Sequence, residues 1–179
     1  MDIYKLNFTT LEQEIFSLLC MRAGEKMSQR DAAKILGVSP TAVSNSINTL
    51  GKSNLIKIEK TKTINFISFN RDNQKAIDLK RAENIKNVYM SGLSDYLESE
   101  LPGGTIILFG SYSRGEDTTT SDIDLAVIER KDKVLDLEKY ETILGRKINV
   151  NFYISWKDIH KHLRNNILNG ILLHGGIEL

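Results

Sequence analysis

A Gly-Ser pair, followed after ten intervening residues by an Asp-x-Asp pair, is the feature that most constrains this chain; both lie in the stretch FGSYSRGEDTTTSDIDL. The preceding run TIILF (105–109) is short, rich in β-branched residues and bounded by Pro and Gly, so it predicts a buried strand that ends at Gly110. A glycine at this point lets backbone amides approach an oxyanion, and the Ser111 hydroxyl adds a further donor. The period of two places the carboxylates of Asp122 and Asp124 on one face of the next strand, where they can share a hard cation. The stretch therefore predicts a phosphate-and-metal site.

This stretch resembles the polymerase-β-type nucleotidyltransferase superfamily, whose signature is a GS pair, a spacer and a DxD pair. The spacer length, with further matches at Arg114, Gly115 and Ser121, resembles the minimal nucleotidyltransferases that occur as antitoxins beside HEPN-type toxins; the resemblance covers roughly residues 84–179. It implies Mg²⁺ or Mn²⁺ as the metal ion and a nucleoside triphosphate, ATP in the first place, as substrate or ligand. It also implies residue roles: nucleotide binding by Gly110, Ser111, Arg114 and Ser121, and metal binding and catalysis by Asp122 and Asp124.

A third acid, which the resemblance implies on a later strand, is missing from this sequence. The strand expected at 147–154 ends at Ser155, which caps a helix, and its distance from that cap puts Asn151 at the catalytic third position. Asn149, on the same face of the strand, is the second candidate for this third position. An amide cannot take a proton at neutral pH, although its carbonyl oxygen can coordinate a cation, and loss of a general base typically costs ~10²–10⁴-fold in rate. The departure puts catalysis in question and leaves nucleotide binding in place.

The N-terminal part of the chain has a different pattern. Apolar residues at helical spacing predict a first helix after Thr9, a second opened by Ser28, and a third from Pro40 to Leu50. Two alternating runs, 55–60 and 63–69, predict a hairpin. The expected nucleic-acid contacts are the small polar residues on the outer face of the third helix and the lysines at the hairpin tip: Thr41, Ser44, Asn45, Asn48, Lys60 and Lys62.

The wording SQRDAAKILGVSPTAVSNSINTL resembles a winged helix-turn-helix of the MarR-like regulators. This resemblance implies that the module binds double-stranded DNA. Glycine-linked helix pairs also occur as plain core motifs, so a structural or protein-docking module is the alternative. Residues 1–70 carry nine Lys and Arg against six Asp and Glu in a chain of net charge +1, a weak bias in favour of nucleic acid.

The expected fold class is α+β, with an N-terminal winged helix-turn-helix and a C-terminal nucleotidyltransferase-like mixed β-sheet with flanking helices. The expected domains are 1–70 for DNA binding, 71–83 for a connecting helix and 84–179 for the nucleotidyltransferase-like part, with continuous helical sequence from Arg71 to Leu101. Within the last domain, the predicted elements are strands near 105–110, 123–129 and 147–154, helices near 84–101, 135–144 and 156–168, and an edge strand within 171–179.

Cys20 lies in an apolar helical context and is expected to be a core residue, and the three histidines lack metal-ligand spacing. No apolar run approaches ~18 residues and no signal peptide is recognisable, which predicts a cytoplasmic protein without membrane contact. Besides DNA, the expected partners are a second copy of the chain, as a homodimer, and, by resemblance, a HEPN-type toxin.

Two functions from different classes follow. In the first, an enzyme transfers a nucleoside monophosphate from a triphosphate to a hydroxyl, which by resemblance includes a tyrosine on a partner toxin. In the second, the Asn at the third position has disabled the chemistry, and the domain is a nucleotide sensor that controls DNA binding. Aminoglycoside modification is less favoured, because the sequence shows no second helical domain to form an acceptor pocket.

Overall fold

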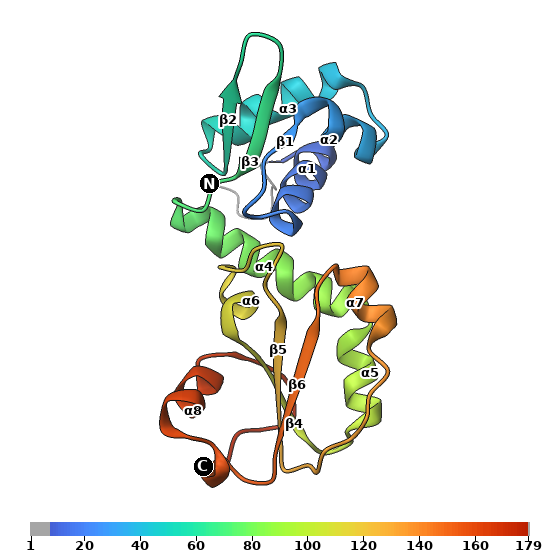
Figure 1. Ribbon diagram of the computed structural model, residues 1–179, viewed down its shortest axis with the longest axis vertical. Coiled ribbons are helices and arrows are strands. Elements are labelled where there is room, and N and C mark those ends of the chain that lie inside the picture. Colours follow the sequence, from blue (N-terminus) through green and yellow to red (C-terminus); the bar gives the residue numbers. More distant parts are fainter. Residues whose placement is uncertain (1–7, 179) are drawn as a thin grey trace. The chain divides into compact units, whose positions relative to one another are not determined.

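The computed structural model describes residues 8–178, and the chain divides into two compact units, one up to Lys80 and the other from Arg81 onward (Figure 1). Residues 1–7 of the expected first domain and Leu179 of the expected last strand lie outside the described residues.

The first unit is a winged helix-turn-helix, as the sequence predicts. Within the described residues its elements are, in chain order, α1 (Thr10–Met21), β1 (Met27–Ser28), α2 (Gln29–Leu36), α3 (Pro40–Lys52), β2 (Ile56–Lys60) and β3 (Asn65–Phe69). β2 and β3 form the expected antiparallel hairpin. The short strand β1 was not expected; it pairs with the other edge of β3 and gives the sheet order β1-β3-β2.

Side-chain caps fix where these helices begin. Thr9 and Glu12 form a capping box at the start of α1, in which each side chain bonds to the backbone of the other residue. Ser28 caps α2 through the Asp31 N–H, at 3.1 Å, as expected from the sequence. Ser39 caps α3 in the same way, and Pro40 takes the first helical position, where a missing N–H costs nothing.

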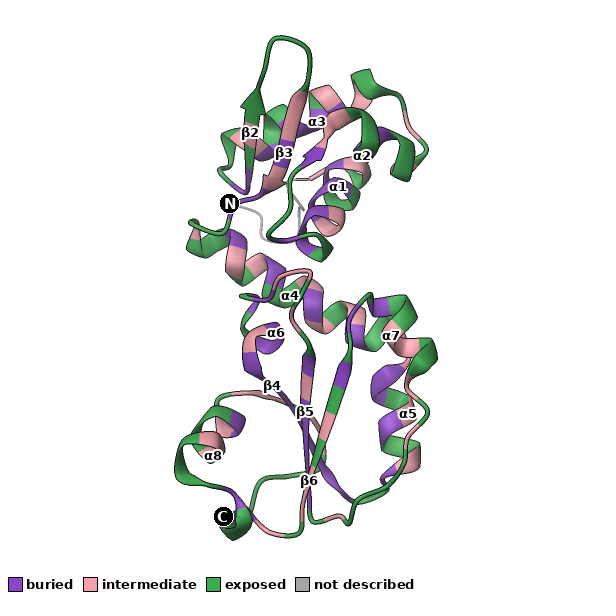
Figure 2. Cartoon of the chain, viewed as in Figure 1, coloured by how far each residue is buried: buried purple, intermediate pink, exposed green. Residues whose placement is uncertain are grey.

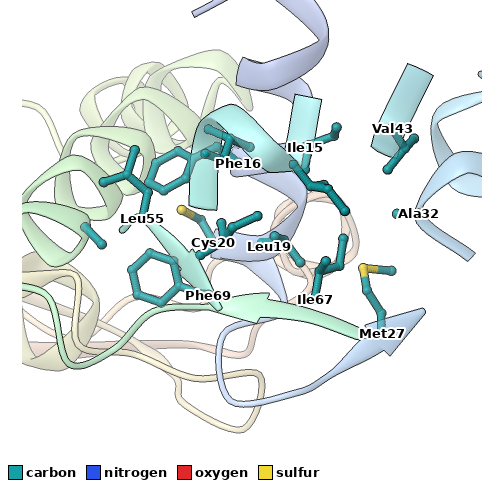
Figure 3. Packing of buried hydrophobic residues seen from close by; sticks show 14 of the residues in the cluster. Ile15, Phe16, Leu19, Cys20, Met27, Ala32, Val43, Leu55, Ile67 and Phe69 are labelled. Carbon is teal, nitrogen blue, oxygen red and sulfur yellow. The ribbon is translucent and has the colours of Figure 1, made fainter. Parts of the chain in front are cut away.

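The core of this unit is formed by side chains of α1, α2, α3 and the sheet. Figure 3 shows Cys20 among the side chains of Phe16, Leu19 and Phe69, and Cys20 is buried, as expected. The rings of Phe16 and Phe69 lie 6.0 Å apart, a separation at which tilted aromatic pairs attract. The free thiol is therefore part of the packing.

The prediction of one continuous helix from Arg71 to Leu101 is wrong. The structure has two helices, α4 (Gln74–Met90) and α5 (Leu93–Glu100), which are separated at Gly92. Gly92 has φ +77°, a left-handed conformation that ends a helix and that glycine adopts at little cost. Along α4, Ala76 packs in the core of the first unit and Val88 in that of the second.

The second unit is built on a mixed sheet with strand order β6-β5-β4-β7. Its further elements are β4 (Thr105–Phe109), α6 (Gly110–Arg114), β5 (Ile123–Ile128), α7 (Glu138–Leu144), β6 (Ile148–Tyr153), a 3-10 turn (Trp156–Asp158), α8 (Lys161–Leu168) and β7 (Ile171–His174). β5 and β6 are parallel, whereas β4 is antiparallel to both of its neighbours. The expected edge strand near the C-terminus is confirmed as β7.

Helices cover both faces of this sheet. On one face, side chains of α4 and α5, such as Val88 and Leu97, pack on Leu108 and Leu125. On the other face, α8 contributes Ile167, which packs with a cluster that includes Trp156, Ile107 and Ala126. The single helix expected over 156–168 is only partly right, because extended backbone at Ile159 separates the 3-10 turn from α8. Among the described residues, no helix has the length and apolar character needed to cross a bilayer.

Candidate active site and nucleic-acid interface

The two aspartates of the DxD pair lie at the start of β5, on the face of the sheet that carries α8. Asp124 pairs with Phe109 at the end of β4 and with Asn149 in β6, so its carboxylate lies where three strands meet. Side chains alternate along a strand, and Ala126 packs in the α8-side cluster. Asp122 and Asp124 therefore share that face, Asp122 exposed and Asp124 half-buried.

Gly110 is required by the close approach of Asp124. It follows β4 directly and adopts φ +76°, and a Cβ atom built on it would lie 2.6 Å from the Asp124 Oδ2 atom. No side chain fits into that space without moving the carboxylate or the backbone. As the sequence predicts, β4 ends and the short helix α6 begins at Gly110. This places the Gly110–Ser111 peptide against the DxD pair.

Asn149, rather than Asn151, is the β6 residue beside the aspartates. The Asn149 amide Nδ2 donates to Asp122 Oδ2 at 3.1 Å and lies 3.4 Å from Asp124 Oδ1. Asn151 lies two residues further along the strand, where it pairs with Ala126 and its amide contacts the Leu125 carbonyl oxygen at 3.5 Å. The prediction that Asn151 occupies the third position is thus corrected: the parallel register of β5 and β6 brings Asn149 to the aspartates instead. The distance to the helix cap, on which the prediction was based, does not determine this register. Figure 2 shows the exposed positions of β6 alternating with less exposed ones.

The remaining nucleotide-binding candidates lie on α6 and the following loop. Ser111 is half-buried in α6. The Ser121 hydroxyl accepts the Thr118 N–H at 3.0 Å and so closes a turn just before Asp122. Arg114 reaches α8: its guanidinium donates to Glu116 Oε2 at 2.7 Å and to Asn166 Oδ1 at 3.2 Å. The Arg114 side chain is therefore held between two elements on the face that carries the aspartates.

The side chains present at this site suit a hard divalent cation with an incomplete protein shell. Asp122 and Asp124 supply carboxylate oxygens, and the Asn149 amide could turn its carbonyl oxygen towards them. Within residues 8–178, no cluster of three or more His, Cys, Asp or Glu side chains is arranged to hold a metal ion. Two carboxylates leave most of an octahedral shell to other oxygens, such as those of phosphate and water, which is how magnesium is commonly bound.

Asn149 was only the second candidate for the third position, and three buried polar residues behind the site, namely Asn84, Asp117 and Arg146, were not predicted. The alternation of Asn149 and Asn151 was visible in the sequence, but only the register distinguishes them. The three buried residues are far apart in the sequence and belong to no common spacing pattern. Pattern reasoning gives no signal for such a group.

In the first unit, the polar residues of α3 lie outward as predicted. Thr41, Asn45 and Asn48 are exposed and Ser44 is half-buried, while the opposite stripe of α3 is in the core. Gln29 donates to the Pro40 carbonyl oxygen at 2.7 Å and accepts from Asn65 at 3.2 Å, which ties the start of α3 to the hairpin.

The hairpin tip carries the two predicted lysines. Lys60 ends β2, Lys62 lies in the connecting loop, and both are exposed. The loop is closed by the Thr61 N–H, which donates to the Ile64 carbonyl oxygen at 2.9 Å. A helix with exposed hydrogen-bonding groups beside a basic hairpin is an arrangement suited to a groove and its phosphates.

Fold and site together define a winged helix-turn-helix followed by a small α+β domain with a glycine-supported pair of aspartates. Residues 90–174 match the family model described as "Nucleotidyltransferase domain". A protein of Methanocaldococcus jannaschii, to which protein adenylyltransferase activity is attributed, is 42% identical over 67 residues, 35% of this chain and 69% of that protein. The chain therefore belongs to the nucleotidyltransferase-domain family.

Solved structures of bacterial proteins are also similar to this chain. The adhesin competence repressor AdcR of Streptococcus pyogenes is 18% identical, with a TM-score of 0.41, over 52% of this chain and 68% of its own. A variant of ZitR from Lactococcus lactis is 17% identical, with a TM-score of 0.42, over 56% of this chain and 66% of its own. ZitR is described as a zinc-responsive MarR family member.

Proposed function

We propose that this chain binds a magnesium nucleoside triphosphate, ATP in the first place, at the Gly110–Asp124 edge and transfers its nucleoside monophosphate to a hydroxyl acceptor. The proposal rests mainly on how closely the Gly110 backbone approaches Asp124: a Cβ atom on Gly110 would lie only 2.6 Å from the Asp124 Oδ2 atom. Such a close approach of backbone and carboxylate is expected where a phosphate must reach both amide donors and a metal ion. Membership of the nucleotidyltransferase-domain family supports the same reaction class.

Each residue of the candidate site has a role in the proposed reaction. Asp122 and Asp124 would hold Mg²⁺ or Mn²⁺, which when bound neutralises the charge of the phosphates. The backbone at Gly110, the Ser111 hydroxyl and Ser121 face the triphosphate as hydrogen-bond donors. Arg114, held by Glu116 and Asn166, stabilises the negative charge that develops on the leaving group.

In the reaction, the acceptor hydroxyl oxygen bonds to the α-phosphorus while the bond between that phosphorus and the bridging oxygen of the leaving pyrophosphate breaks. The hydroxyl proton must leave at the same time. Asn149 lies where a proton acceptor would act, but an amide cannot accept a proton at neutral pH. Transfer is therefore slow unless the acceptor hydroxyl loses its proton to water or to a group of its own, at a cost of ~10²–10⁴-fold in rate.

The acceptor is a protein hydroxyl in this proposal. The name of the Methanocaldococcus jannaschii relative supports a protein acceptor, and the resemblance to antitoxins that accompany HEPN-type toxins adds a tyrosine of such a partner as the first candidate. The exposed polar face of α3 and the lysines of the β2–β3 hairpin, the wing, support a second activity, binding of double-stranded DNA. The chain is proposed to bind DNA as a homodimer.

A second function is favoured by one specific contact. The Asn149 amide faces both carboxylates and hydrogen-bonds to Asp122, so it reduces their mutual repulsion and occupies part of the space that a second cation would need. In this alternative the domain binds a nucleotide without transferring it and acts as a sensor that regulates DNA binding by the winged helix.

Transfer of label from α-labelled ATP distinguishes the two functions. The native chain, incubated with its partner protein and magnesium, should give weak labelling that disappears in Asp124→Asn. The Asn149→Asp variant should label the partner ~10²-fold faster, because it restores a proton acceptor beside Asp122 and Asp124. Asn151→Asp is the matched control, since it adds the same charge two residues along β6, and it should leave the rate unchanged.

Three results decide against parts of this proposal. Complete absence of labelling in the native chain and in Asn149→Asp, with ATP still bound, favours the sensor. Robust native labelling that is as fast as in Asn149→Asp means that the missing carboxylate is not needed. Acceleration by Asn151→Asp but not by Asn149→Asp means that the position beside Ala126 is the functional one.

A further inference from the structure

Three buried polar side chains meet behind the aspartates, within the second unit. The Asn84 amide Nδ2, on α4, donates to Asp117 Oδ1 at 2.7 Å and to the Tyr112 carbonyl oxygen at 2.8 Å. The other carboxylate oxygen of Asp117, Oδ2, lies 3.6 Å from Arg146 Nη2, and the two side chains are only 1% and 6% exposed. None of these groups lies among the residues assigned above to nucleotide or metal.

The group joins the segments that deliver the site residues. Tyr112 belongs to α6, directly after Gly110 and Ser111, and Asp117 lies in the loop that leads to Asp122. Arg146 lies in the turn before β6, three residues ahead of Asn149, and its guanidinium also donates to the Gly145 carbonyl oxygen at 2.9 Å. A displacement of Asp117 would therefore act on both sides of the site.

Two hydrogen bonds close the loop between Asp117 and Asp122. The Thr118 N–H donates to the Ser121 hydroxyl, and the Ser121 N–H donates to the Thr118 carbonyl oxygen, both at 3.0 Å. Two reciprocal bonds close this turn, so it transmits a movement of Asp117 to Asp122 instead of absorbing it. A buried carboxylate is itself held strongly, because an ion pair and directional hydrogen bonds must offset its desolvation.

We propose that Asp117 is a positioning residue, which Asn84 and Arg146 hold so that Asp122 and Asp124 keep the spacing that a magnesium triphosphate requires. The inference rests on the proposed function of the site and adds residues to it that touch neither metal nor phosphate. Two carboxylates on one strand bind a cation well only if their distance and orientation are fixed in advance, and outer partners commonly supply that constraint.

The test measures binding of Mg²⁺ with α,β-methylene-ATP, an analogue that cannot be turned over at the α-phosphorus, to the full chain by calorimetry. Asn84→Ala removes the amide that holds Asp117 and leaves the Arg146 pair in place, so Kd should rise about tenfold. Arg146→Lys keeps the positive charge beside Asp117, but an ammonium cannot replace a guanidinium that contacts Asp117 and Gly145 together; its Kd should rise less than that of Asn84→Ala.

Leu97→Ala is the control for stability alone. Leu97 is a fully buried residue of α5 in the core of the same unit, so this variant should lower the melting temperature at least as much as Asn84→Ala. Its Kd for the analogue should stay within about twofold of the native value, because the apolar Leu97 side chain makes no hydrogen bond to Asp117 or to the loop that leads to Asp122.

The outcomes separate the inference from the function on which it rests. Native affinity in folded Asn84→Ala and Arg146→Lys overturns the positioning role while the proposed site stands. Equal weakening in Leu97→Ala also overturns it, because loss of stability alone would then explain the effect. Absence of binding to the native chain removes the proposed function, and the positioning role with it.

Discussion

At Gly110 the chain combines a left-handed backbone with a close approach to the Asp124 carboxylate. Gly110→Ala should therefore have two effects: strain from φ +76° and a collision with Asp124 Oδ2. Gly145 provides a matched comparison, since it has φ +61° and nothing within 4 Å of an added Cβ. Gly145→Ala should lose only the ~1–2 kcal/mol of a left-handed alanine, whereas Gly110→Ala should lose more and should also lose binding of magnesium and ATP.

Chemical denaturation gives the free energies of unfolding, and calorimetry the affinities, for both glycine variants. If Gly110→Ala binds magnesium and ATP as the native chain does, the phosphate cannot lie against this peptide.

Glu12 makes the stability of the chain depend on pH. Burial alone would raise the pKa of this carboxyl group, but hydrogen bonds from the Thr9 N–H and from the hydroxyls of Thr49 and Thr9 outweigh that effect and lower it. A lowered folded pKa means that the carboxylate stabilises the fold above its unfolded pKa, about 4.3, and that this contribution is lost as pH falls through the folded value. Glu12→Gln keeps a capping side chain but not the charge.

The free energies of unfolding in urea of the native chain and of Glu12→Gln should thus differ at pH 7, and this difference should be smaller at pH 3. Glu14→Gln, an exposed change in the same helix, should show no such convergence. A native advantage of the same size at both pH values would mean that the Glu12 charge does not contribute.

Among the elements, we expect the β2–β3 wing to set the overall affinity for DNA and α3 to set the preference for particular sequences. Replacing Lys60 and Lys62 with Ala should weaken all sequences alike and make the salt dependence shallower by about 2 in log–log slope, because each lysine releases phosphate counterions. Replacing Asn45 with Ala should instead cost about 1–3 kcal/mol on preferred sequences only.

Gel shifts over a genomic fragment library, at several salt concentrations, test both expectations. The paired change of Lys131 and Lys157 to Ala removes the same charge from the second unit and serves as the control. Absence of retention at low salt by the native chain would favour a protein-docking role for the winged helix, and equal effects of the two lysine pairs would show that the wing has no special part.

Elements with strong local signals were predictable, and those decided by tertiary pairing were not. Hydrophobic spacing with Ser and Pro caps predicted α2 and α3, and β-branched runs predicted β4 and β5. β1 is only Met27–Ser28, too short for any alternation, and exists because β3 offers it a partner. The break at Gly92 was a missed signal, since glycine after a periodic run is a common helix stop.

Across the whole molecule, the site was predictable as a set of residue types and less so as a geometry. The GS and DxD pairs identify Gly110, Asp122 and Asp124 because they are adjacent in sequence to the strands that position them. The third residue comes from a separate strand, and a parallel register has no signature in either strand alone. Asn149 and Asn151 could therefore be distinguished only by the pairing of β6 with β5.

In the function that we propose, Asp122 and Asp124 together hold a magnesium nucleoside triphosphate. Isothermal titration of the full chain with ATP, in the presence and absence of Mg²⁺, tests it most directly when the native chain is compared with the double variant Asp122→Asn, Asp124→Asn. The account predicts magnesium-dependent binding of ATP to the native chain and its loss in the double variant, because two amides supply none of the charge that a hard cation requires. Unchanged ATP affinity in the double variant, with the fold intact, would contradict it.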